Sequence, residues 1–304
     1  MLKYSNCVKR ITASGGGDLQ ADAGESFVIK QLYGEPSASD TFLTLRVDRK
    51  TVGVYRLGGK AGNHLSFYTE GNFKHNLMEF LTSKGINVTI PIAEGQTFTV
   101  SRYAETGEVV IVYDIYDAGD IRADMPNGSA SKQYLFINYL NNSATKAASG
   151  DLILDESQSP AEFPAFPAAE LVPARTTIEV LGVIGQPTGH KTTGDNYILT
   201  TFLKMIKDRE TLFDEDRAGI LFRAKKPSED KTMYRTDFSL IGGCVMNSYS
   251  QADELLSDPW MFDPALVFKS GEELLMYVTL LLEGTDTFEA DTADVALIEH
   301  VIVE

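Results

Sequence analysis

The chain has 304 residues, of which 43% are hydrophobic and 10% aromatic, enough for one large domain or two of moderate size. Its formal net charge is −16 and its pI is about 4.7, which disfavours nucleic-acid binding by the surface as a whole. No apolar stretch is long enough to span a bilayer, and no apolar signal core follows the first basic residues. Cys7 and Cys244 form no disulfide framework, and we expect two buried thiols in a protein made in a reducing cytoplasm.

Positive charge gathers near the N-terminus at Lys3, Lys9 and Arg10, and again at 223–226. Charges of this kind are usually solvated loop residues, and that is our interpretation of both clusters. The alternative is that one face of an assembly meets a membrane or a genome, with the N-terminal segment acting as a basic arm.

The first half of the chain alternates strand patterns with turn residues. A Gly-Asp-Leu step at 17–19 precedes a strand that ends in Gly-Glu-Pro at 34–36. We then predict a hairpin with an Asp-Arg turn at 42–55, a short helix at 75–82, a strand-turn-strand segment at 88–100 and a long closing strand at 108–115.

The second half repeats this order. Gly-Asp-Leu recurs at 150–152, a strand ending in Gly-Gln-Pro at 176–187, an Asp-Arg hairpin at 202–213, a short helix at 251–257, a strand-turn-strand segment at 266–278 and a closing strand at 294–303. In isolation the pattern at 198–206 would also fit an amphipathic helix, but the repeat favours a strand.

The segment 118–132, rich in Gly, Ala, Asp and Ser, is typical of a linker, and a strand at 134–140 would open the second half. The Pro-rich run 159–173 fits a surface loop rather than a central strand. We therefore predict an all-β fold with domains at 1–125 and 126–304, each an eight-stranded jelly-roll barrel with short helices in its loops. The alternative is two unrelated β domains with similar turns.

The sequence contains no catalytic or metal-binding constellation that we recognise. The four histidines are isolated from one another, and no nucleophile elbow, phosphate-binding loop or dinucleotide fingerprint is present. Acidic groups at 117–124 and 214–216 do not have calcium-loop spacing, so we interpret them as solvated loops, with calcium as the alternative. No cofactor and no enzymatic activity are predicted.

Aromatic side chains gather in the segment 258–264, which is bracketed by prolines and contains the single tryptophan. Trp260 and Phe262 would suit a platform on which a sugar ring stacks. We favour the other interpretation, in which they pack onto a barrel or into a neighbouring subunit.

The tandem of two such β units, carried by the Gly-Asp-Leu, Gly-Glu/Gln-Pro and Asp-Arg repeats, resembles the double jelly-roll major capsid proteins. These proteins form the coats of tailless icosahedral viruses, including bacteriophages and the adenovirus-hexon lineage. The resemblance implies a homotrimer with a pseudo-hexagonal ring of six barrels, made in the host cytoplasm and located in the virion. It also implies contacts with minor capsid proteins and, on the inner face, with a membrane or genome that is not bound sequence-specifically.

Other classes of function stay open at this stage. One is a carbohydrate- or receptor-binding β-sandwich, such as a phage fibre tip or a lectin, which would use Trp260. Another is a spike or vertex protein of a virion. An enzyme on a β-sandwich is disfavoured by the missing histidine cluster.

Overall fold

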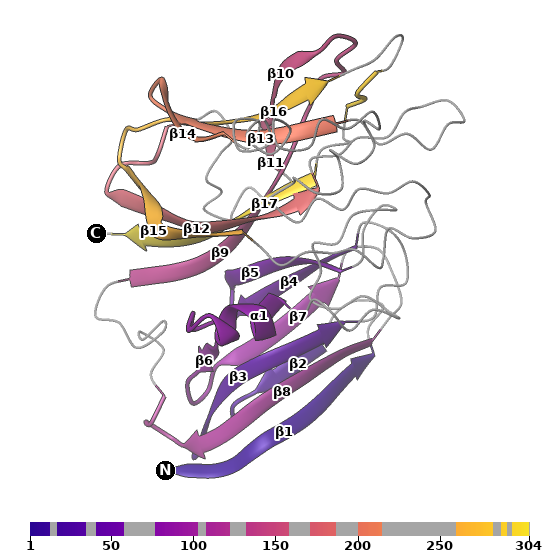
Figure 1. Cartoon of the computed structure of the whole chain (residues 1–304). Helices are drawn as coiled ribbons and strands as arrows, with labels where there is room; N and C mark the ends of the chain where they lie inside the picture. Colours follow the sequence, from indigo (N-terminus) through magenta and orange to yellow (C-terminus); the bar gives the residue numbers. More distant parts are fainter. Residues whose placement is uncertain are drawn as a thin grey trace. The chain divides into compact units, whose positions relative to one another are not determined.

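Antiparallel β-strands and one short helix make up the described part of the chain in a computed structural model (Figure 1). The described residues are 1–12, 17–34, 41–57, 77–102, 108–121, 132–157, 171–186, 200–214, 260–281, 287–290 and 294–303. The all-β prediction is therefore confirmed. Within these ranges, no helix has the length and apolar character needed to cross a membrane.

The chain divides into two compact units. Unit 1 runs from Met1 to Ile137 apart from a few residues near position 62, and it includes Val301–Glu304. Unit 2 takes up Asn138–His300.

Unit 1 contains two four-stranded sheets, with strand orders β1-β8-β3-β6 and β2-β7-β4-β5. In Figure 1 the first of these sheets lies in front of the second. The elements are β1 (Leu2–Thr12), β2 (Gly17–Gln20), β3 (Glu25–Gly34), β4 (Thr41–Val47), β5 (Lys50–Leu57), α1 (Leu77–Ser83), β6 (Ile90–Ile92), β7 (Thr97–Arg102) and β8 (Glu108–Asp117).

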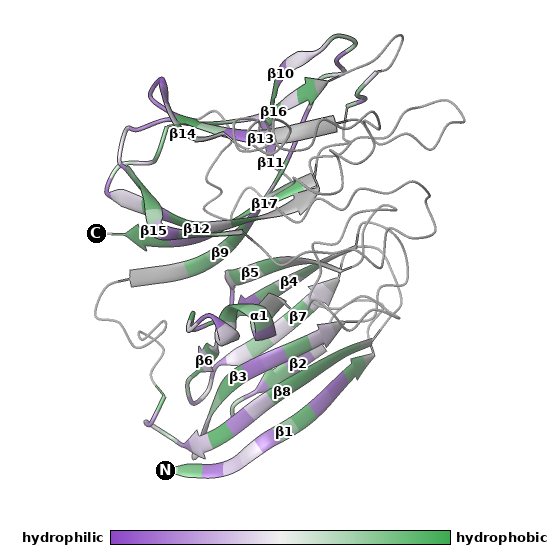
Figure 2. Cartoon of the chain, viewed as in Figure 1, coloured by the Kyte–Doolittle hydropathy of each residue, from purple (hydrophilic) through white to green (hydrophobic). Residues whose placement is uncertain are grey.

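The core of unit 1 follows from alternation along these strands. Phe27 and Ile29 on β3 are buried, as are Phe98 and Val100 on β7, while the residues between them are more exposed. Figure 2 shows bands of hydrophobic and hydrophilic residues along β1, β3 and β8. Each such side chain contributes about 1.5–3 kcal/mol when it leaves water, so this inner layer holds the two sheets together.

Unit 2 contains a five-stranded sheet, β11-β9-β17-β12-β15, and a four-stranded sheet, β10-β16-β13-β14, with residues 132–137 of β9 and 301–303 of β17 grouped with unit 1. Its strands are β9 (Lys132–Asn141), β10 (Gly150–Ile153), β11 (Glu156–Ser157), β12 (Thr176–Gln186), β13 (Thr200–Lys207), β14 (Glu210–Asp214), β15 (Trp260–Lys269), β16 (Leu274–Leu281) and β17 (Asp294–Val303).

Two neighbouring strands of the five-stranded sheet are buried on both faces. Every residue of β9 from Phe136 onward is buried, and so is every residue of β17 from Val295 to Glu299. Strands covered on both sides have near-continuous apolar sequences, and Val-Ala-Leu-Ile at 295–298 has this form. Glu299 is the exception, because it is a carboxyl residue with no exposed surface on this strand.

The two Asp-Arg hairpins have the same hydrogen bonds. The Asp48 N–H donates to the Thr97 carbonyl at 2.8 Å, and Asp48 Oδ1 accepts from the Thr97 N–H at 3.0 Å. In unit 2 the Asp208 N–H donates to the Glu273 carbonyl at 3.3 Å, and Asp208 Oδ1 accepts from the Glu273 N–H at 3.0 Å. Both aspartates have positive φ, at 54° and 45°. The same residue type therefore connects the same pair of turns in each unit.

A second pair of turns also matches. The Gln96 N–H donates to the Ala93 carbonyl, and Gln96 Oε1 accepts from the Ala93 N–H at 2.9 Å. The Glu272 N–H donates to the Lys269 carbonyl, and Glu272 Oε2 accepts from the Lys269 N–H at 2.6 Å. The third residue of each turn is a glycine, with φ of 80° and 83°. A left-handed conformation explains the glycine in both copies.

Several sequence expectations can be compared directly. The segment from Phe202 is a strand, β13, as the repeat predicted, because it pairs with β14 and β16. The predicted first helix is α1. The second, at 251–257, lies outside the described residues, as do 223–226, the acidic group at 215–216 and most of the Pro-rich run.

The interpretation of Lys3, Lys9 and Arg10 as loop charges is wrong. All three belong to β1, which pairs with β8 from Leu2 to Thr12. The polar Ser5-Asn6 step hides the strand in the sequence, because the register shifts there and Asn6 has a φ of 55°. Gly17, the glycine of the first Gly-Asp-Leu step, is the first residue of β2.

Candidate interaction surface

Three valines lie on the outward face of β1 and β8 in unit 1, where a solvated sheet face would be polar. Paired residues share a face, and the register pairs Val8 with Val112 and Arg10 with Val110. The adjacent pair Ile11 and Val109 is buried, so it faces the core. Val8, Val110 and Val112 therefore point away from the core. We call the face formed by Val8, Arg10, Val110 and Val112 the outer valine face.

Exposed apolar side chains are concentrated at the beginning of β1. Tyr4 and Val8 are each 63% exposed and Leu2 is 47% exposed. Together with Met1 they are four of the seven large hydrophobic residues that are exposed in the described part of the chain. Among the described strands β1 is also an edge strand, since β8 is the one strand there that pairs with it. An apolar face beside an open edge is typical of a surface that another molecule covers.

A polar cluster holds the bulge in β1. Asp114 on β8 accepts a hydrogen bond from the Asn6 N–H at 2.8 Å and pairs with the Lys30 ammonium at 2.9 Å. Lys30 Nζ also donates to Asn6 Oδ1 at 2.7 Å. Asp114 is only 8% exposed, but its carboxylate is stabilised by the positive charge of the Lys30 ammonium and by the hydrogen bond from the Asn6 N–H. The left-handed Asn6 is thus fixed by side chains from β3 and β8.

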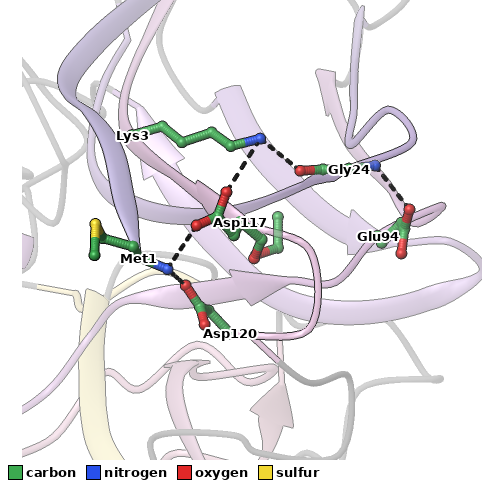
Figure 3. A network of polar contacts seen from close by, with 7 residues as sticks. Met1, Lys3, Gly24, Glu94, Asp117 and Asp120 are labelled. Carbon is green, nitrogen blue, oxygen red and sulfur yellow. Dashed lines mark hydrogen bonds and ion pairs between the residues drawn. The ribbon is translucent and has the colours of Figure 1, made fainter.

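Figure 3 shows the charged network at the start of β1: Met1, Lys3, Gly24, Glu94, Asp117 and Asp120. Lys3 Nζ donates to the Gly24 carbonyl at 2.7 Å and lies 3.4 Å from Asp117. The ammonium group of Met1 pairs with Asp117 at 2.9 Å and with Asp120. Its hydrogen bond to Asp117 is the largest effect on that carboxyl, and with Lys3 it lowers the pKa of Asp117 below 3.8 despite the opposing effect of desolvation.

The other two basic residues of β1 have different environments. Lys9 Nζ donates to the Asp18 carbonyl on β2 at 2.8 Å, so it connects the two sheets of unit 1. In unit 2 Lys146 Nζ donates to the Asp151 carbonyl, the equivalent position of the repeated Gly-Asp-Leu step. Arg10 is exposed and belongs to the outer valine face. Of the three predicted basic residues, Lys3 and Arg10 are therefore exposed, and Lys9 is half-buried.

The predicted aromatic pair lies on β15 in unit 2. The backbone of Trp260 pairs with Val183, and Phe262 is half-buried. The side chain of Trp260 lies outside the described part of the structure. A stacking platform at Trp260 and Phe262 therefore stays a prediction.

The described ranges contain no cluster of three or more His, Cys, Asp and Glu side chains that suits a metal site. His300 Nδ1 lies 3.7 Å from Glu179, but burial is the largest effect and lowers the pKa of His300 below 6.5. Cys7 is a half-buried free thiol.

The residues that make the outer valine face and its neighbouring polar cluster were not predicted from the sequence. Val110 and Val112 were assigned only to a closing strand, and Asn6, Lys30 and Asp114 were not singled out. The sequence signal for an apolar outward face was the unbroken Val-Val-Ile-Val run at 109–112. A strand with one solvated face should instead alternate apolar and polar residues.

The chain matches no protein-family model, and neither a curated protein nor a solved structure is significantly similar to it. Its function is therefore argued from strand order, contacts and exposed surface alone.

Proposed function

We propose that each unit is a jelly-roll domain. In unit 1 the eight strands, numbered by chain position, form sheets in the order 1-8-3-6 and 2-7-4-5. If the two-residue strand β11 is set aside, the eight strands of unit 2 have the same two orders. This interleaving is what two Greek keys rolled into a sandwich produce. The matching turns at Asp48 and Asp208 support the same conclusion from side-chain contacts.

We infer that the chain is a structural coat protein, the major capsid protein of an icosahedral virion, which assembles as a homotrimer and then as a shell. The single observation that carries this proposal is the repeat of one strand order in both units. Two barrels per chain make a three-fold assembly pseudo-six-fold, which suits a closed lattice of side-by-side barrels. Contacts with minor capsid proteins, and with a membrane or genome, belong to this proposal.

The outer valine face is the proposed contact between copies in unit 1. Its exposed Val8 and the neighbouring Tyr4 would leave water on association. β1 carries three basic residues and no acidic one, whereas the whole chain has a net charge of −16. A second copy of this acidic chain therefore complements β1 in charge as well as in polarity.

Light scattering on the purified protein, followed by negative-stain imaging, tests this proposal. We expect a stable trimer with a hexagonal outline, or sheets and shells. A monomer that stays monomeric at high concentration would overturn the coat-protein proposal. Binding of that monomer to a glycan array, lost in Trp260→Ala, would establish the carbohydrate-binding alternative instead.

A further inference from the structure

Glu299 is a buried carboxyl on a strand inside a sheet. It lies on β17, which is flanked by β9 and β12, and its side chain is fully buried. Within the described part of the chain, neither carboxylate oxygen has a hydrogen bond of normal geometry. A charged carboxylate without partners in an apolar core is strongly unfavourable.

Alternation along β17 indicates where the side chain points. His300 approaches Glu179 of β12 at 3.7 Å, so these two side chains share one face of the sheet, whereas the buried Ile178 and Val180 on either side of Glu179 face the core. Glu299 takes the opposite face, together with the buried Leu297 and Val301. It therefore points into the interior of unit 2.

The surroundings of Glu299 provide little stabilisation for its charged form. On β9 the buried Asn138 lies beside it, and Glu179 of β12 faces the other way. The buried residues described on the facing sheet are apolar: Leu152 on β10, Met205 on β13, and Met276, Val278 and Leu280 on β16. Burial raises the pKa of Glu299 well above 4.5, the smaller effect of the Asn138 amide lowers it, and no charge in the described part of unit 2 acts on it.

The contrast with Asp114 in unit 1 shows that this chain does stabilise a buried acid elsewhere. Asp114 is 8% exposed, and it has both the Lys30 ammonium and the Asn6 N–H within 3 Å. Glu299 has neither a cation nor a backbone donor at such a distance within the described residues.

We propose that Glu299 is a pH-controlled latch of unit 2: its neutral form keeps β17 packed between β9 and β12, and its ionisation opens these strands. The proposal concerns unit 2 alone and holds whether or not the chain is a coat protein. Because the folded state binds this proton more tightly than the unfolded chain, unit 2 loses stability as the pH rises above the unfolded-state pKa near 4.5. The loss stops growing once the pH exceeds the raised pKa of the folded state.

The test compares the full chain with Glu299→Gln between pH 5 and pH 10. In the wild type, opening of β17, followed by amide hydrogen exchange, should become more favourable by up to about tenfold per pH unit relative to the variant. Glu299→Gln should make the opening of β17 less dependent on pH and should be more stable above pH 5. The control is Glu210→Gln, which removes an exposed carboxyl from the same unit and should retain the wild-type pH dependence.

A second measurement does not depend on how the variants fold. Infrared difference spectra of the wild type should contain the C=O stretch of a neutral carboxylic acid that persists above the ordinary glutamate pKa of 4.5 and disappears on alkaline titration. Absence of that band, or an identical pH dependence in wild type and Glu299→Gln, would overturn the proposal. If Glu299→Gln does not fold, Glu299→Leu replaces it in the exchange experiment.

Discussion

Asp48 lies at the turn between β4 and β5 with its Oδ1 atom 3.0 Å from the backbone nitrogen of Thr97, the first residue of β7. The contact joins two turns that are 49 residues apart in the chain. Asp208 makes the equivalent contact in unit 2, where the sequence separation is 65 residues. Turn residues that also connect distant strands help to fix the strand order, which is why the Asp-Arg repeat is informative.

Replacing Asp48 with alanine should destabilise unit 1 by about 2 kcal/mol, about half from the lost hydrogen bond and half from the positive φ. Asparagine tolerates that backbone conformation and keeps a side-chain acceptor, so Asp48→Asn should cost less. Asp208→Ala and Asp208→Asn should behave alike in unit 2. Hydrogen exchange of β4–β5 and β13–β14 measures each unit separately, and equal losses for alanine and asparagine would contradict this account.

Gly17 begins β2 at a position where a side chain has no room. A Cβ atom there would lie 2.1 Å from Cγ2 of the buried Ile11. Gly17→Ala should therefore destabilise unit 1 by about 1–3 kcal/mol through overpacking.

A double-mutant cycle provides the control for Gly17. In an Ile11→Ala background the space is free, so Gly17→Ala should cost much less. Gly150, the equivalent residue in unit 2, has a φ of 126° and no atom closer than 3.7 Å to a built Cβ. Its substitution should destabilise through backbone strain, and no change at residue 11 should relieve it. An undiminished cost of Gly17→Ala in the Ile11→Ala background would reject the steric explanation.

Asp151 makes the stability of unit 2 depend on pH in the acidic range. Burial opposes its ionisation, but hydrogen bonds from Lys204 and Thr279 outweigh burial and lower its pKa below 3.8. A lowered pKa stabilises the folded state above about pH 3.8, and this contribution disappears as the pH falls through the folded-state value.

Lys204→Met should therefore reduce the stability of unit 2 at pH 7, and the difference from the wild type should shrink at pH 3. Thr279→Val, which removes a neutral donor at 2.8 Å, should act in the same direction but more weakly. Denaturant unfolding at both pH values measures the two differences. A Lys204→Met effect that is as large at pH 3 as at pH 7 would show that lost packing, not charge, is responsible.

The sequence predicted most of the strands because their polar and apolar residues alternate between clear turn signals. The strand at Thr176–Gln186 and the closing strand at Asp294–Val303 have the boundaries that the pattern indicated. β1 could not be predicted in this way, because its register is set by contacts of Asn6 with Asp114 and Lys30, which are 108 and 24 residues away.

The candidate surface was harder to predict than the fold. Basic residues drew attention to β1, but two of them bind carbonyl groups of the same unit, Lys3 that of Gly24 and Lys9 that of Asp18. The outward direction of Val8 follows only from its register with Val112. Residue type shows that a side chain is apolar, and pairing is needed to show which face it occupies.

Val8→Asp tests the outer valine face. Val8 is 63% exposed, so the substitution should leave the stability of the isolated chain nearly unchanged. If a second copy covers Val8, association should weaken about 10- to 100-fold, because the loss of about 1.5–3 kcal/mol of apolar burial lowers affinity tenfold for each 1.4 kcal/mol.

Val267→Asp is the matched control, since Val267 is 41% exposed on β15 of unit 2. Sedimentation velocity across a concentration series measures both variants. Equal weakening by the two would point to net charge, already −16, as the cause. No weakening by Val8→Asp would remove this face from the assembly and leave the strand-order argument as the remaining support for a coat protein.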